Sequence, residues 1–124
     1  LTTMDADTSN LAARPYTVVQ TPTEATGSGA IATALDPGFA WELIGVEVHL
    51  NAVGASGSLT ITKDANSGAA YDTNLLTADM TAQADVVYYP AVPILFGASD
   101  GLDIAWANAG GKTYGLTIWY ARRY

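Results

Sequence analysis

The single histidine, His49, is the first place to look for chemistry, because any Ser-His-Asp or Cys-His arrangement would have to use it. Glu47 lies two residues before it in a run with strand periodicity, so both side chains are expected on one face, next to each other. A carboxylate beside an imidazole could orient a general base. The chain has no cysteine and no paired catalytic motif. We therefore interpret His49 as an exposed strand histidine beside an acidic neighbour, and we expect no enzymatic activity.

The carboxylates are the next candidates. The chain has twelve, and they are scattered over turns and strand ends. A glycosidase needs two carboxyl groups about 5 to 9.5 Å apart in a cleft, and the sequence places no pair in that way. We interpret these residues as solubilising charges.

A short polar segment, Asp64-x-Asn66-x-Gly68, resembles the start of a calcium loop, in which oxygen ligands alternate along a tight turn. The sixth and twelfth positions of an EF-hand loop require Gly and Glu, whereas this chain has Ala69 and Leu75 there. Asp and Asn in a hairpin turn explain the segment without a metal. We predict neither a metal nor a cofactor.

Aromatic side chains provide the remaining candidates. Large planar rings on a β-sandwich can stack on sugars, and they also anchor subunit interfaces. Trp119 is predicted on the face of its strand opposite the core, which makes it the best single candidate. Three roles stay open for this set, namely core packing, a subunit interface or a ligand platform. The candidates are Trp41, Trp119, Tyr88 and Tyr89.

Composition limits the partners of the chain. It carries 5 basic against 12 acidic residues, a net charge of −7, so a phosphate-binding surface and a nucleic-acid role are disfavoured. No run of 18 apolar residues exists that could cross a membrane as a helix. Only 14% of the residues are charged, whereas a soluble monomer carries about a quarter. A secreted binding domain or a subunit covered by its own copies would have such a surface, and we favour the second.

The strongest structural pattern lies near the C-terminus, where two runs with a period of two residues, 102–107 and 113–120, flank a turn that contains Gly110 and Gly111. Leu102, Ile104 and Trp106 fall on one face of the first run and are predicted to be buried. The glycines allow the positive φ angles of a tight turn, so the two runs predict an antiparallel hairpin.

Residue 39 begins the longest strand candidate, which ends at residue 50. Its predicted core face carries Ile44, Val46, Val48 and Leu50, and Trp41 lies on the opposite face. Residues 71–80 could form a helical turn or a short strand with an irregular tail, and we favour the strand. Residues 22–29 read as a loop by composition.

Short strands separated by Gly and Pro indicate an all-β fold, an antiparallel β-sandwich of the jelly-roll type with about eight strands. Residues 1–14 show neither helical nor strand periodicity, and they predict an N-terminal arm that gains order only against another chain. A single domain follows at 15–124. The chain begins with Leu1, which suggests a removed leader, processing or trimming. The expected strands are 16–20, 30–35, 39–50, 58–63, 71–80, 85–89, 92–96, 102–107 and 113–120.

Between residues 36 and 120 the chain resembles the small jelly-roll proteins encoded among the structural genes of tailed bacteriophages. Those proteins decorate the capsid or sit at its vertices and tail. The resemblance implies a virion structural subunit that forms a symmetric oligomer and attaches to other virion proteins such as the major capsid protein. From the charge-poor surface we expect a cyclic oligomer, most plausibly a trimer. The resemblance carries over no functional residue. A carbohydrate-binding β-sandwich module is the alternative. The segments that carry the resemblance are 71–76, 86–88, 93–95, 101–108 and 113–120.

Overall fold

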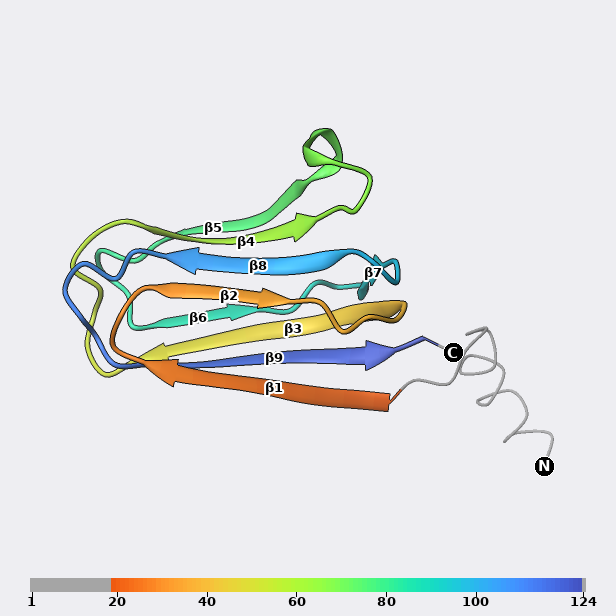
Figure 1. Cartoon of the computed structure of the whole chain (residues 1–124). Helices are drawn as coiled ribbons and strands as arrows, with labels where there is room; N and C mark the ends of the chain where they lie inside the picture. The colour runs from red at the N-terminus through yellow and green to blue at the C-terminus, as the bar shows by residue number, and fades with distance from the viewer. Residues whose placement is uncertain (1–18, 124) are drawn as a thin grey trace, which may run out of the picture.

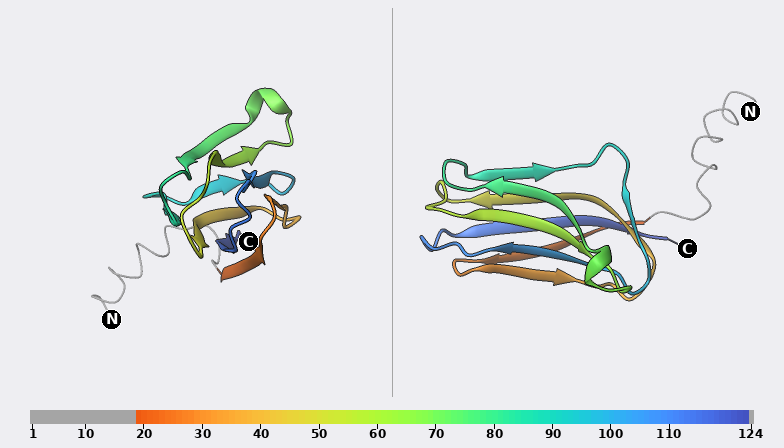
Figure 2. Two further views of the ribbon diagram at one scale, coloured as in Figure 1. Left: turned by 90° about the vertical axis from the view of Figure 1, so that its left-hand side faces the viewer. Right: turned by 90° about the horizontal axis from the view of Figure 1, so that it is seen from above.

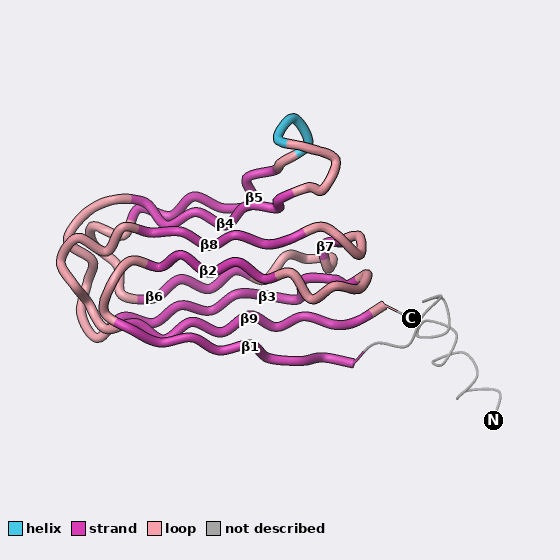
Figure 3. Tube along the Cα trace, in the orientation of Figure 1, coloured by secondary structure: helices cyan, strands magenta, loops and turns pink. Residues whose placement is uncertain are grey.

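The computed structural model describes residues 19–123, which form nine β-strands and one 3-10 helix (Figures 1 and 3). The predicted arm at 1–14 lies outside the described residues. Within 19–123 the expectation of strands with almost no helix is confirmed, and no helix there is long and apolar enough to cross a membrane. The elements are β1 (Val19–Gly27), β2 (Ile31–Leu35), β3 (Trp41–Leu50), β4 (Ser58–Asp64), η1 (Ala69–Tyr71), β5 (Thr73–Asp79), β6 (Asp85–Tyr88), β7 (Ile94–Phe96), β8 (Gly101–Trp106) and β9 (Tyr114–Arg122).

Two antiparallel sheets pack face to face as a sandwich (Figure 2). The β3 sheet has the order β1-β9-β3-β6, and β7 also pairs with β3. The β8 sheet has the order β2-β8-β4-β5. β6 pairs with the second half of β3 and β7 with its first half, so the two short strands occupy one position. Counted in this way, the order is that of an eight-stranded jelly roll, as predicted.

The C-terminal strands correct the predicted hairpin. β8 lies between β2 and β4, whereas β9 lies between β1 and β3 in the other sheet, so the chain crosses the sandwich between them. Leu102, Ile104 and Trp106 are nevertheless buried, as are Leu116 and Ile118 of β9. An alternating pattern specifies which side chains face inward, and it does not specify the neighbouring strand.

Asn108 fixes this crossing. Its backbone has a φ of 51°, a left-handed conformation that Asn tolerates better than most residues. Its side chain is 4% exposed. The amide Nδ2 donates to the carbonyl oxygens of Ser28, Gly29 and Lys112 at 3.3, 2.9 and 2.8 Å, and Oδ1 accepts from the Lys112 N–H at 2.9 Å. One side chain thus ties the β8–β9 crossing to the β1–β2 connection.

A bulge in β3 changes which of its side chains face the core. The register with β9 pairs Leu43 with Tyr120 and Gly45 with Trp119, which leaves Ile44 as an extra residue. Trp41 therefore faces inward, and it is fully buried. The prediction that Ile44 lies on the core face and Trp41 on the opposite one is wrong at this end of the strand. It holds after the bulge, where Val46, Val48 and Leu50 are buried.

The first connection is shorter than expected. Residues 22–29 were predicted to form a loop, but β1 continues to Gly27 along β9. β1 is an edge strand, and Pro22 can be accommodated there because one side of the strand needs no amide donor. The expected strand in residues 71–80 is confirmed as β5, and η1 precedes it.

Candidate functional site

The structure separates the four aromatic candidates into two pairs. Trp41 stacks on Phe96 in the core, with ring centroids 4.0 Å apart, and its Nε1 donates to the carbonyl oxygen of Asp100. Tyr88 lies on the inner side of β6 and packs against the same core. Both residues have the core-packing role. Trp119 and Tyr89 lie instead on the outer face of the β3 sheet.

Trp119 and Tyr89 meet at one carboxylate. The indole Nε1 of Trp119 donates to Oε1 of Glu47 at 3.1 Å, and the Tyr89 hydroxyl donates to the same oxygen at 2.7 Å. Gly45 is the cross-strand partner of Trp119. A Cβ added at Gly45 would lie 2.4 Å from ring atoms of Tyr89, so the tyrosine ring covers this glycine. We call these four residues the aromatic cluster.

Glu47 also governs the titration of this cluster. The hydrogen bond from Tyr89 to Glu47, with smaller contributions from burial and from the negative charge, raises the pKa of the Tyr89 hydroxyl above its ordinary value. The phenol, which carries its proton at neutral pH as an ordinary tyrosine does, acts as the donor. Its ring remains 48% exposed.

Exposed apolar side chains gather beside the cluster. Six large hydrophobic residues are exposed within the described part of the chain, and four of them belong to residues 87–95. This segment runs from the end of β6 through the connection to the start of β7, at one edge of the β3 sheet (Figure 1). We call the four side chains the apolar edge: Val87, Tyr89, Val92 and Leu95, which are 67, 48, 75 and 49% exposed.

A groove with polar and apolar lining residues lies toward the opposite edge of the same sheet, over β1 and β9. It has a volume of about 370 Å³ and is lined by Glu24, Thr26, Gly115 and Thr117, among others. Thr117 pairs with Glu24 on one side and with Glu47 on the other. The groove therefore borders the aromatic cluster.

His49 has a different partner from the one predicted. Its Nδ1 lies 2.5 Å from Oδ1 of Asp85, the cross-strand neighbour on β6, whereas Glu47 holds the two aromatic donors. The side chains of His49 and Asp85 are 73 and 64% exposed. The interpretation as an exposed strand histidine beside an acidic neighbour is confirmed, with Asp85 in place of Glu47.

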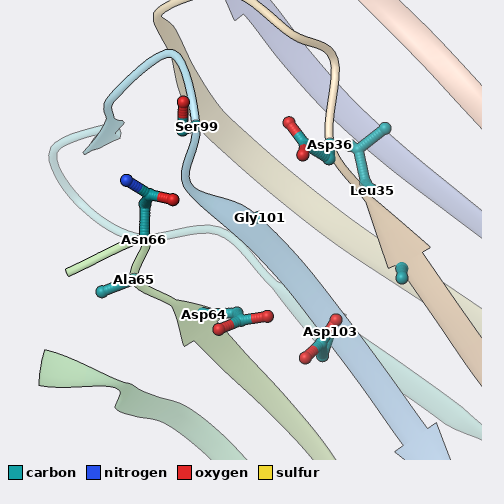
Figure 4. Close-up of a pocket in the computed structure, with 9 residues that line it drawn as sticks. Leu35, Asp36, Asp64, Ala65, Asn66, Ser99, Gly101 and Asp103 are labelled. Atoms are coloured by element: carbon teal, nitrogen blue, oxygen red, sulfur yellow. The ribbon is translucent and has the colours of Figure 1, made fainter. Parts of the chain in front are cut away.

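A second pocket, of about 440 Å³, collects acidic residues at the end of the β8 sheet (Figure 4). Asp64 and Asp103 point toward one another there, and Asp36 lies across the pocket. Burial, followed by the charges of Asp64 and Asp72, raises the pKa of Asp103. Among residues 19–123 no group of three or more His, Cys, Asp or Glu side chains is placed to hold a metal ion.

Backbone N–H groups donate hydrogen bonds to the carboxylates around the Asp64–Gly68 turn. The Ala65 N–H donates to Asp72, and the Asn66 N–H donates to Asp100, each at 2.9 Å. The bond from Asn66, followed by one from the Gly97 N–H, lowers the pKa of Asp100. The turn is thus held by hydrogen bonds to two carboxylates that lie outside it.

Sequence reasoning missed the role of Glu47. It is 42 residues from Tyr89 and 72 from Trp119 along the chain. No short-range pattern could link the three, since the contact depends on the register of three strands.

Comparisons with known proteins find a likeness among solved structures. No protein-family model matches the chain, and no curated protein matches it. Among solved structures it is similar to a chain from Bacillus endospore appendages, described as a family of disulfide-linked pili. The two chains are 14% identical with a TM-score of 0.46, and the match covers 87% of this chain and 89% of the other.

Proposed function

We propose that this chain is a non-enzymatic structural subunit that assembles with copies of itself and attaches to a larger particle. The apolar edge is the observation that carries the proposal. Four large apolar side chains within nine residues form a patch that water solvates poorly, and such patches on folded proteins mark interaction sites. Burial of the patch contributes about 25 cal/mol for each Å² of apolar surface removed from water.

The backbone at this edge indicates how copies would meet. β6 and β7 have four and three residues, and the connection between them contains Pro90 and Pro93. Short, proline-interrupted edge strands resist continuous pairing with another sheet. Copies would therefore contact one another through side chains, with Val92 and Leu95 in the interface, and a closed ring such as a trimer satisfies every edge.

The particle in this proposal is the virion of a tailed bacteriophage, and the attachment partner is another virion protein such as the major capsid protein. The resemblance of residues 36–120 to small virion jelly rolls supports this part. Peptides of this chain should then be found in purified virions. Their absence would contradict the virion location and leave self-assembly to be judged on its own.

Paired substitutions test self-assembly. Val92→Asp combined with Leu95→Asp places two charges in the proposed interface, where an unpaired buried charge costs several kcal/mol. The variant should sediment as a monomer at concentrations where the unmodified chain is an oligomer. Val53→Asp is the matched control, because Val53 is 51% exposed and lies outside the apolar edge, and it should leave the mass unchanged. An oligomer that survives the double substitution would refute this interface.

A further inference from the structure

We propose that the outer face of the β3 sheet binds a neutral oligosaccharide along a strip that joins the aromatic cluster to the groove over β1 and β9. The strip shares Tyr89 with the apolar edge, and its other residues lie outside that edge. A protein surface is the alternative occupant, and it would be expected on a dry apolar patch. This strip instead presents hydroxyls and carboxylates beside two aromatic rings. We call it the sugar strip: Trp119, Tyr89, Glu47, Thr117, Glu24, Thr26 and Gly115.

The rings of the sugar strip are held in place before a ligand arrives. Trp119 and Tyr89 both donate to Glu47, and the Tyr89 ring rests on Gly45. Their polar groups are therefore engaged while Tyr89 remains 48% exposed and Trp119 partly exposed. Rings fixed in this way can contact the C–H face of a pyranose with little loss of conformational entropy.

Carboxylates supply acceptors for sugar hydroxyls. An ionised carboxylate has about four acceptor positions. Two donors occupy Oε1 of Glu47, and within residues 19–123 no hydrogen bond engages its Oε2. Glu24 is exposed at the far end of the groove. Two carboxylates on a chain with a net charge of −7 would repel uronic acids and sialic acids, so the ligand should be neutral.

Gly115 forms the floor of the groove. A Cβ added there would meet no atom within 4 Å, so the missing side chain leaves open space above the strand. Thr26 and Thr117 border this space, and the Thr26 hydroxyl, which donates to the Tyr114 carbonyl oxygen at 2.7 Å, can still accept a bond. The volume of about 370 Å³ falls within the range of small-ligand sites, roughly 300 to 1,000 Å³.

Isothermal titration with defined probes tests the proposal. Hexasaccharides of cellulose, xylan and β-mannan represent neutral ligands, and an oligogalacturonate of equal length represents acidic ones. At least one neutral probe should bind, and the acidic probe should not. Failure of all three neutral probes at millimolar concentration, or preference for the acidic one, would overturn the proposal.

Variants then locate the binding. Trp119→Ala should weaken it about 30-fold, which corresponds to the ~2 kcal/mol typical of a truncated aromatic anchor. Gly115→Val fills the groove with a side chain that strands favour, so it should abolish binding without unfolding the sheet. Tyr71→Ala is the matched control, since Tyr71 is 66% exposed and lies in η1, outside the strip. Binding that persists in both strip variants would refute the assignment even if self-assembly is established.

Discussion

Replacement of Asn108 should destabilise the fold more than most single substitutions in the loops that connect the strands, because this side chain secures the crossing between β8 and β9. Its amide has two hydrogens for three carbonyl acceptors, at 2.8, 2.9 and 3.3 Å, so the longest contact shares a hydrogen with one of the others. Together with the bond from Lys112 N–H to Oδ1, this amounts to about three full hydrogen bonds, each contributing about 1 kcal/mol.

Two variants separate the side-chain bonds from the backbone conformation. Asn108→Gly keeps the φ of 51° accessible and loses only the side chain, so the free energy of unfolding should fall by about 3 kcal/mol. Asn108→Ala adds the cost of a left-handed alanine, about 1 to 2 kcal/mol. In a domain of about 100 residues, a loss of 3 kcal/mol lowers the melting temperature by at least about 10 °C.

Urea denaturation followed by tryptophan fluorescence measures both values. We expect Asn108→Gly to be strongly destabilised, and we expect Asn108→Ala to have a still lower free energy of unfolding. A glycine variant as stable as the unmodified chain would show that the four contacts of Asn108 do not secure the crossing.

Two further predictions follow from close packing and from charge. Gly45→Ala displaces the Tyr89 ring from Glu47, so the free energy of unfolding should fall by about 1 kcal/mol and the Tyr89 pKa, measured by NMR, should return toward its ordinary value. Gly115→Ala is the control, because a Cβ at that position meets no atom within 4 Å. Equal effects of the two substitutions would contradict the packing argument. The raised pKa of Asp103 means that the fold holds this proton more tightly than the unfolded chain, so its contribution to stability is fully present below the ordinary pKa of 3.8 and is lost as the pH rises through the folded pKa. Asp103→Asn should therefore raise the melting temperature at pH 7 and give no gain near pH 3; a melting temperature that is lowered at pH 7 would oppose the sign of the shift.

Local pattern predicts most of the strands, although it places a loop at 22–29 where β1 continues to Gly27, and it does not predict the partners of the strands. Alternation identified the inward face of β8 and β9, because side chains on a strand point to opposite faces in turn. A hairpin and a crossing between sheets bury the same side chains, so the pattern at 102–107 and 113–120 could not distinguish them. The distinguishing feature is Asn108, whose partners at Ser28 and Gly29 are about 80 residues away along the chain.

The candidate site was predicted in part for a related reason. Trp119 was placed correctly on the outer face, because its strand alternates without interruption up to that point. The pattern places Trp41 on the wrong face, since one extra residue at Ile44 reverses the alternation. Gly45 offered the only local hint, because glycine inside a strand often marks a bulge or a close approach.

Sedimentation equilibrium of the unmodified chain tests the central claim, self-assembly through the apolar edge, most directly. The proposal predicts a closed oligomer at micromolar concentration, with a mass near three times the 12.9 kDa of one chain for a trimer. The oligomer should dissociate when Val92 and Leu95 are both replaced by Asp. A mass of 12.9 kDa over the whole concentration range would contradict the claim.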